Sequence, residues 1–294
     1  MTPSKTTAIH LEPSIRKAVG ALCAVVAAMV TACGGGGDGN APASGLPPPP
    51  APAPLPAPAP PPPPPAPVVR DYGWRGALGA VVSEPTPRKL VLATSADSHY
   101  LLAVYGVDAD TDFKARGLLE AYATASSPTR YMGVAGTGLV ANVDLTVSSD
   151  SQVISGTLLE RGELKPVVGG GSAAVGYRFD QPASMAAVAG RWELSTSEGR
   201  NLSIDIDPQG VVTGTSGSCA LYESKVAPTS TGYGVFAITL RFRVGAFACS
   251  EPHGGSDGVH GFAVVYPLQS GETQLVVGAA NGWDPVYLAA AGKR

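Results

Sequence analysis

The sequence predicts an all-β protein, an antiparallel meander closed into a barrel or a sandwich, behind a disordered Pro-rich stalk. Apolar and polar residues alternate with period two, most clearly in residues 201–207 (NLSIDID), as in a half-buried strand. Clusters of Gly, Ser, Asp and Pro separate such segments at short intervals. Sixteen of the 28 prolines lie between Pro42 and Pro67, so the 227 residues that follow are Pro-poor and sufficient for one large or two small domains.

The composition excludes one class of partner. The chain has 20 Lys and Arg against 23 Asp and Glu, a net charge of −3, and no basic block. Proteins that bind nucleic acid need clustered Lys and Arg to neutralise phosphates, so we expect no nucleic-acid partner.

The first 32 residues are typical of a signal peptide. Lys5, Arg16 and Lys17 form a positive n-region, and residues 18–32 are an uncharged apolar run of 15 residues. This run is shorter than the roughly 20 apolar residues that a transmembrane helix needs. The alternative interpretations are an ordinary secretory signal and a short buried helix. Neither explains why a cysteine, Cys33, follows the apolar run.

Val30-Thr31-Ala32-Cys33 resembles the lipobox of bacterial lipoproteins. The resemblance implies that the Cys33 thiol carries diacylglycerol, that cleavage makes Cys33 the mature N-terminus, and that its amine is a second acylation site, so palmitate is expected. Two or three acyl chains hold a protein on a membrane stably, at about 0.8 kcal/mol per buried methylene. Gly34 stands where an Asp favours the inner membrane, which implies the outer membrane, at its periplasmic face or at the cell surface.

Residues 33–67 are predicted to be a lipid-anchored linker. Residues 34–40 are Gly-rich and flexible, whereas residues 47–67 are a proline run that cannot form ladder hydrogen bonds. As a polyproline helix of about 3.1 Å per residue, this run would span up to roughly 65 Å. We interpret it as a spacer rather than as a ligand of SH3-like or WW-like domains, which are not expected in a bacterial envelope.

The predicted strands come next in the chain. They are residues 90–94, 100–105, 118–123, 143–147, 153–159, 201–207, a strand that begins at Val211, and residues 238–244, 262–266 and 275–277. The segment Asp207-Pro208-Gln209-Gly210 fits a type I turn. In residues 238–244, Thr239, Arg241 and Arg243 are predicted to form the wet face. The one helix candidate, residues 112–124, is interrupted by Gly117 and fits equally well a loop that enters a strand.

Two β-units are predicted, residues 68–181 and 182–294. Residues 73–76 (GWRG) and 190–192 (GRW) open them, and residues 151–157 (SQVISGT) resemble residues 209–215 (QGVVTGT). Coincidence remains an alternative, since Gly-Thr after valines is common in strands. The Gly-x-Trp openings and the segment 214–219 (GTSGSC) also resemble β-rich lipoproteins of uncharacterised function in proteobacteria, a likeness that implies no activity.

The cysteines suit an exported domain. Cys23 is removed with the signal peptide and Cys33 takes the lipid, which leaves Cys219 and Cys249 as an even pair that we expect to form a disulfide. Closing this loop stabilises the fold by roughly 3 to 4 kcal/mol in the chain-entropy description. The alternative is a metal site of Cys249, His253, Asp257 and His260, whose spacing matches no standard zinc pattern.

Two further motifs resemble functional sites and fail on inspection. Residues 254–258 (GGSDG) match the G-x-S-x-G string around a hydrolase serine, here Ser256, but a strand rather than a helix follows, and His260 is the only downstream histidine. Asp108, Asp110 and Asp112 imitate an EF-hand that lacks the required Gly and Glu, which leaves nonspecific surface calcium as an alternative. We therefore predict no catalytic residue, no metal and no cofactor.

The sequence thus predicts a lipid-anchored envelope or surface lipoprotein with a non-catalytic binding domain, in which loops or a barrel mouth recognise an unknown protein or small molecule. The alternatives are an envelope serine hydrolase that uses Ser256 and a structural envelope accessory. An exposed aromatic patch that includes Trp283 or Tyr287 would favour binding. A serine beside His260 would favour the hydrolase, and a uniformly polar exterior would favour the accessory.

Overall fold

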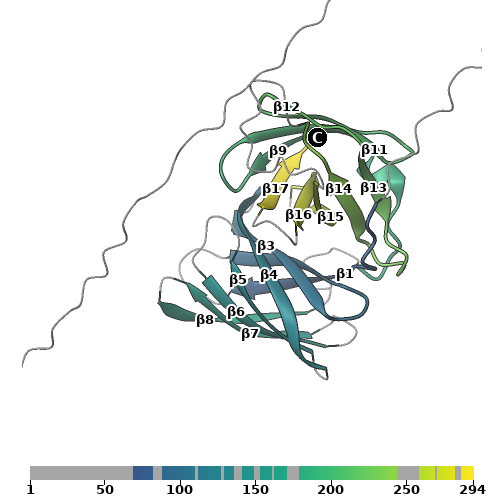
Figure 1. The fold of residues 1–294 in the computed structure, drawn as a ribbon. Coiled ribbons are helices and arrows are strands. Elements are labelled where there is room, and N and C mark those ends of the chain that lie inside the picture. The colour runs from purple at the N-terminus through teal and green to yellow at the C-terminus, as the bar shows by residue number, and fades with distance from the viewer. Residues whose placement is uncertain are drawn as a thin grey trace, which may run out of the picture. The chain divides into compact units, whose positions relative to one another are not determined.

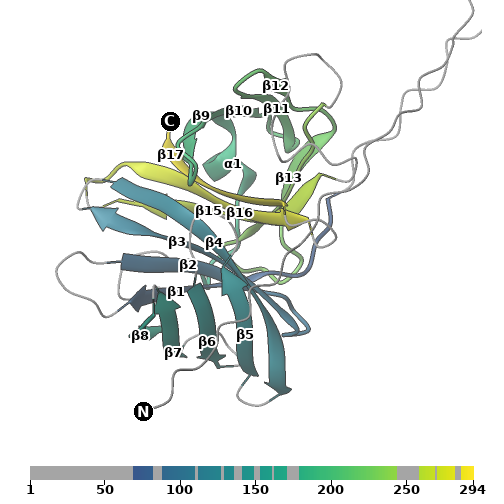
Figure 2. The ribbon, with the colours of Figure 1, turned by 60° about the vertical axis from the view of Figure 1, so that its left-hand side comes forward.

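Antiparallel strands make up most of the chain that the structure, a computed structural model, describes (Figures 1 and 2). In this part the one helix, α1 (Met185–Val188), has four residues. The all-β prediction is therefore confirmed. The described residues are 69–81, 88–109, 112–126, 129–135, 141–148, 153–160, 162–170, 179–243, 258–268, 270–281 and 286–294.

The first eight strands form a closed barrel in which each strand pairs with the next and β8 pairs with β1. They are β1 (Arg75–Val81), β2 (Arg88–Thr94), β3 (Tyr100–Ala109), β4 (Asp112–Ser126), β5 (Thr129–Ala135), β6 (Ala141–Val147), β7 (Val153–Glu160) and β8 (Glu163–Gly170). We refer to them as the first barrel.

The remaining strands form a nine-stranded sheet that also closes on itself, because β10 pairs with both β9 and β11. Only β12, which pairs with β11, lies outside this ring of described strands, which we refer to as the second barrel. The strands are β9 (Gly190–Thr196), β10 (Asn201–Ile206), β11 (Val211–Ser216), β12 (Cys219–Ala220), β13 (Ser224–Pro228), β14 (Phe236–Leu240), β15 (Val259–Pro267), β16 (Thr273–Asn281) and β17 (Val286–Lys293).

Apolar side chains fill the interior of each barrel. Leu92, Leu101 and Leu145 belong to the buried cluster inside the first barrel. Trp192 and Ile204 belong to the one inside the second barrel, together with the predicted buried face of Ile238, Leu240 and Phe242. Small barrels of about eight strands have interiors just wide enough for their own side chains. Among the described residues, the apolar side chains inside each barrel therefore belong to its core.

A third core joins the two barrels, with β2, β3 and β4 against β14 to β17 (Figure 2). Leu90 and Leu92 point into the first barrel while Val91 and Ala93 point into this third core, and all four are fully buried. Strands buried on both faces are apolar at successive positions rather than at alternate ones.

The prediction that Thr239, Arg241 and Arg243 form a solvent-exposed face of residues 238–244 is wrong for Thr239. Thr239 is fully buried, because it shares the outward face of β14 with Ala237, which packs in the third core. Arg243 is exposed, as predicted, and Arg241 is half-buried.

The structure also decides the segment that suited either a helix or a loop. Residues 112–126 form β4, a strand of 15 residues. Phe113 and Ala115 are buried in the third core while Lys114 and Arg116 between them are exposed. The β3–β4 register shifts beside Gly106, where Arg116 is left without a partner residue on β3. The missing side chain of Gly106 makes room for the Phe113 ring, which a Cβ there would approach to 2.5 Å. Burial of Phe113 and Ala115 in the third core therefore favours a strand over the helix that residues 112–124 could also form.

Where the structure describes them, the similar segments 151–157 and 209–215 lie in equivalent hairpins, β6–β7 and β10–β11, which we refer to as the shared hairpin. Gly156 of β7 pairs with Leu145 of β6, and Gly214 of β11 pairs with Ile204 of β10. Both glycines have a positive φ, 152° and 147°, and a Cβ on either would lie 2.1 Å from a carbonyl oxygen of the partner strand.

The two tryptophans of the predicted unit openings, in contrast, differ in environment. Trp74 packs in the third core and Trp192 inside the second barrel. The division into β-units 68–181 and 182–294 as separate domains stays a prediction, and residues 62–294 form one compact unit.

Candidate functional site

Four tyrosines gather where the start of β3, the middle of β4 and the start of β17 meet the segment before β1. Tyr72, Tyr100, Tyr122 and Tyr287, with the carboxylate of Glu120, are referred to here as the tyrosine cluster. Tyr122 is 54% exposed and Tyr72 is 39% exposed, which is unusual for large side chains in this structure. An exposed aromatic patch, the feature that would favour binding, is therefore present and includes the half-buried Tyr287, whereas Trp283 lies outside the described residues.

Glu120 holds the cluster together. Its buried carboxylate accepts hydrogen bonds from the hydroxyls of Tyr100 at 2.8 Å and Tyr122 at 2.7 Å. Burial, followed by the charge and the hydrogen bond of Glu120, raises the pKa of Tyr100 far above its ordinary value of 10.0. Burial and the same carboxylate also raise the pKa of Tyr122 and of Tyr287. All three hydroxyls thus stay protonated at neutral pH and act as donors.

Ring contacts extend the cluster into the third core. The centroids of Tyr100 and Tyr122 lie 5.2 Å apart, those of Trp74 and Tyr100 5.8 Å, and those of Tyr72 and Trp74 5.0 Å, all tilted. Such aromatic pairs are worth about 0.5–1.5 kcal/mol each beyond the buried area. The exposed rings therefore rest on a fully buried tryptophan and form a preorganised surface.

The segment that carries Tyr72 is fixed to the second barrel. The Asp71 carboxylate accepts hydrogen bonds from the main chain of Gly73 at 2.7 Å and of Ser230 at 2.9 Å. The Thr231 hydroxyl donates to the Trp74 carbonyl at 2.9 Å. These contacts hold Tyr72 in place although it precedes the first strand.

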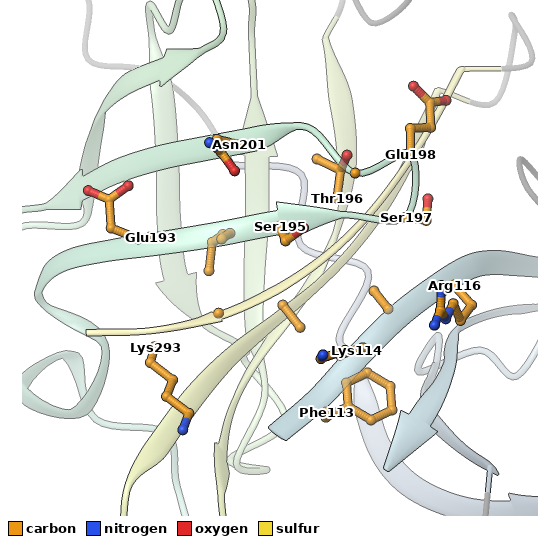
Figure 3. A pocket seen from close by; sticks show the side chains of 15 residues that line it. Phe113, Lys114, Arg116, Glu193, Ser195, Thr196, Ser197, Glu198, Asn201 and Lys293 are labelled. Atoms are coloured by element: carbon orange, nitrogen blue, oxygen red, sulfur yellow. The ribbon is translucent and has the colours of Figure 1, made fainter. Parts of the chain in front are cut away.

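A groove, the junction groove, lies where the start of β4 packs beside the end of β17 (Figure 3). It has a volume of about 720 Å³ and is lined by residues 113–116 of β4, residues 193–199 of β9 and its turn, Asn201, and residues 291–293 of β17. Its walls thus come from both barrels.

The charged residues of the groove differ in their pairing. Glu193 pairs with Arg191 at 2.8 Å, and Lys293 pairs with Glu272 at 2.6 Å. Lys114 and Arg116 on the opposite wall are exposed and make no ion pair with any described residue.

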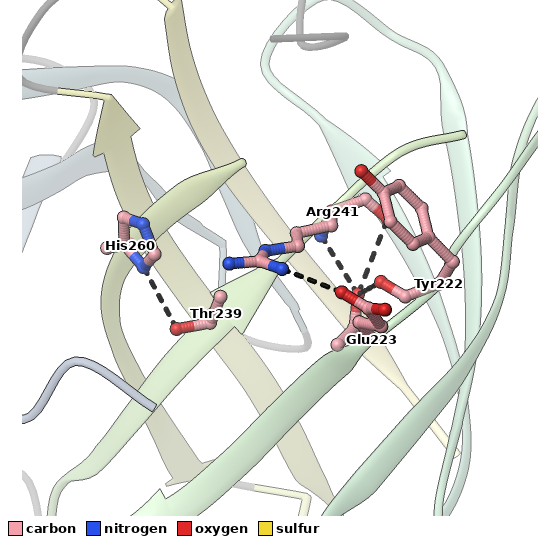
Figure 4. A network of polar contacts seen from close by, with 6 residues as sticks. Tyr222, Glu223, Thr239, Arg241 and His260 are labelled. Atoms are coloured by element: carbon pink, nitrogen blue, oxygen red, sulfur yellow. Dashed lines mark hydrogen bonds and ion pairs between the residues drawn. The ribbon is translucent and has the colours of Figure 1, made fainter. Parts of the chain in front are cut away.

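His260 is a buried residue within the sheet and contacts a threonine rather than a serine. It is 6% exposed in β15, and its Nδ1 lies 2.9 Å from the Thr239 hydroxyl on β14 (Figure 4). Nearby, Arg241 pairs with Glu223 at 2.8 Å, and the Arg241 main-chain N–H donates to the Ser224 hydroxyl. The hydroxyl seen beside His260 is thus a threonine on the neighbouring strand.

Several predicted site residues lie outside the described residues. They are Cys33, Cys249, His253, Ser256, Asp257 and Asp110. Cys219 is described and is 1% exposed within the core of the second barrel. Its pairing with Cys249, the lipidation of Cys33 and the alternatives that involve these residues therefore stay predictions.

Two general features concern the described residues as a whole. They include no group of three or more His, Cys, Asp or Glu side chains placed to hold a metal ion. Among the same residues, no helix has the length and apolar character that a membrane crossing requires.

Sequence reasoning named Tyr287 but missed Glu120 and the junction groove. Glu120 and Tyr122 are two residues apart and share one face of β4, which was readable from the predicted strand 118–123. The other members come from segments far apart in the chain, and no local pattern joins them.

Comparison with known proteins yields little. No family model and no curated protein matches the sequence. Among solved structures, the chain is similar to the isotype 1 transferrin binding protein B of serogroup B Neisseria meningitidis, with 9% sequence identity and a TM-score of 0.27, over 74% of this chain and 66% of that chain. A TM-score this low does not establish a common fold.

Proposed function

We propose that this protein is a lipid-anchored envelope lipoprotein that binds a partner protein, without catalysis, through the tyrosine cluster. The observation that carries the proposal is the pair of exposed rings, of which Tyr72 packs on the buried Trp74 and Tyr122 is held by Glu120. Tyrosine is enriched at binding hot spots because it offers a large contact area at a low cost in side-chain entropy.

Two properties of the fold support a binding role. Closed barrels give a rigid scaffold without free sheet edges along most of their length. Their interiors are filled by apolar side chains, so the exposed surface is what a partner can reach. An exposed, preorganised aromatic patch on such a scaffold suits a protein partner better than a small molecule, which needs a concave site.

The test is recovery of partners by the full-length protein from intact cells. Tyr122→Ala removes the most exposed ring of the cluster, and Leu164→Ala, at a side chain 70% exposed on β8, is the matched control. We expect a partner that wild type and the Leu164 variant recover equally and that the Tyr122 variant recovers at least tenfold less. Equal recovery by all three would contradict a role for the cluster.

The anchor has its own test. Replacing Cys33 by Ala leaves the precursor without the thiol that the lipobox reaction needs. We expect wild type to partition into the detergent phase and Cys33→Ala to remain aqueous. Equal partitioning of the two would remove the lipoprotein proposal and leave the binding proposal standing.

A further inference from the structure

We propose that the junction groove is a second binding site, and that it takes an acidic saccharide, a hydroxyl-rich ligand that carries carboxylate or sulfate groups. This site does not depend on the tyrosine cluster. Lys114 at the groove and Tyr122 in the cluster pair with Val107 and Tyr100 of β3, which are seven residues apart, or about 23 Å at 3.3 Å per strand residue. A ligand of a few sugar units in one site does not reach the other.

The groove has the size and the walls of a ligand site. Its volume of about 720 Å³ falls within the roughly 300–1,000 Å³ typical of small-ligand pockets. It exists because β17 pairs with β9 over Ala290–Lys293 while β4, which belongs to the other barrel, packs alongside. A bound ligand would therefore touch both barrels.

The charges of the groove select an anion. The Glu193 carboxylate accepts hydrogen bonds from Arg191 at 2.8 Å and from the Ser203 hydroxyl at 2.9 Å. These contacts hold the pKa of Glu193 below its ordinary value, so it is ionised and already paired. Glu198 lies 3.4 Å from Arg200 in the same turn. Both acidic groups are thus paired with arginines beside them in the chain.

The cations on the facing wall are not compensated in this way. Lys114 and Arg116 alternate with buried residues on the exposed face of β4, and each lacks an ion-pair partner within the described ranges. Arg116 is a bulge residue, because Ala115 pairs with Gly106 and Gly117 with Tyr105, so the two cations lie on the same short stretch of the groove wall on either side of Ala115. Charged groups on one ligand would meet both cations, and Arg116 can bind a carboxylate or sulfate through two parallel N–H donors.

The remaining wall explains why a saccharide fits better than an acidic peptide. Ser195, Ser197 and Asn201, which are exposed or half-buried, present neutral hydroxyl and amide groups to the groove. The large apolar residues of the lining, Phe113 and Leu194, are 1% and 3% exposed, so a ligand would meet no large apolar side chain in the groove.

The experiment is calorimetric titration of the full mature protein with saccharides of equal length. A tetragalacturonate supplies carboxylates, a heparin tetrasaccharide supplies sulfates, maltotetraose is the neutral control, and a tetraglutamate peptide represents the acidic peptide. We expect binding of one or both acidic saccharides, at least tenfold weaker binding of maltotetraose and tetraglutamate, and affinity that falls as salt rises. Absence of binding by both acidic saccharides at millimolar concentration, or equal binding of tetraglutamate, would overturn the proposal.

Variants locate the site. Lys114→Ala with Arg116→Ala removes both uncompensated cations, and Lys225→Ala with Arg243→Ala makes the same change in net charge away from the groove. We expect the first double variant to lose at least tenfold in affinity, and the second and Tyr122→Ala to keep it. Since the side chains changed in the first variant are exposed, its melting temperature should match wild type. Equal losses in both double variants, or loss in the Tyr122 variant, would overturn the assignment.

Discussion

The side-chain amide of Gln274 on β16 pairs with both main-chain groups of Phe113 on β4. The Phe113 N–H donates to Gln274 Oε1 at 2.9 Å, and Gln274 Nε2 donates to the Phe113 carbonyl at 3.2 Å. Among the described strands, β5 pairs with β4 only from Leu119 onward, so Phe113 has no strand partner on that side. The Gln274 amide thus makes the two main-chain hydrogen bonds that a neighbouring strand would make to Phe113. These bonds join the two barrels beside the junction groove.

Gln274→Ala should destabilise the fold by about 2–3 kcal/mol, because it leaves a buried N–H and a buried carbonyl of Phe113 without these hydrogen bonds. The melting temperature should fall by roughly 2–4 °C per kcal/mol for a domain of this size. Calorimetry measures the change, with Gln209→Ala in an exposed turn as the control. Equal melting temperatures for the two variants would contradict a structural role of this amide pair.

The shared hairpin makes a prediction for two glycines. Gly156→Ala and Gly214→Ala should each be strongly destabilising, because the new methyl group would lie 2.1 Å from a partner-strand carbonyl oxygen. Gly162→Ala is the control, since its φ of 84° is also positive but nothing lies within 4 Å of the added Cβ. We expect a loss of about 1 kcal/mol for the control and several times that for the other two. Similar losses at all three positions would argue against a close strand approach at Gly156 and Gly214.

The tyrosine cluster predicts sensitivity to alkaline pH. The pKa of Tyr100 is raised in the folded state, so between its ordinary value of 10.0 and its folded value the native protein binds one more proton than the unfolded chain. Stability from this group is therefore complete below about pH 10 and is lost as the pH rises further. In urea unfolding from pH 8 to 11, Tyr100→Phe should lose about 1.5–3 kcal/mol at pH 8, and the difference from wild type should shrink above pH 10.

Tyr222→Phe, at a half-buried tyrosine outside the cluster, is the control for this pH series. A constant difference between wild type and Tyr100→Phe across the series would show that the Tyr100 hydroxyl does not titrate abnormally.

The predicted disulfide is tested by mass spectrometry of the mature protein without reductant. We expect a peptide that links Cys219 to Cys249, and a melting temperature several degrees lower for Cys219→Ser, because the bridge restrains the unfolded chain. Since Cys219 is buried in the core of the second barrel, Cys249→Ser separates loss of the bridge from a packing defect at Cys219. Two free thiols together with one equivalent of zinc would support the metal alternative instead.

The serine hydrolase alternative makes an opposite prediction for Ser256. If the protein is a binding module, Ser256→Ala should leave partner recovery, saccharide affinity and melting temperature unchanged. The His260 Nδ1 is already engaged with Thr239, which does not favour His260 as the base. Covalent labelling of the wild type by a fluorophosphonate probe, lost in the Ser256 variant, would support the serine hydrolase hypothesis over the binding hypothesis.

Local pattern was sufficient for much of this protein. The alternation in residues 201–207 predicted β10, and the Asp207 turn is present, with its carboxylate accepting the main-chain N–H groups of Gln209 and Val211. These features depend on residues close in the chain, whose period and turn chemistry are readable without the fold. The scarcity of helix followed from the same alternation.

Only the tertiary structure decided which faces are buried and where the sites lie. Thr239 is buried because another barrel covers its face, and residues 112–126 are a strand because Phe113 and Ala115 pack across that interface. The tyrosine cluster and the junction groove each combine segments more than 70 residues apart in sequence. Packing between distant segments leaves no period in the chain, so the sequence determined the strands and the interface between the barrels determined the sites.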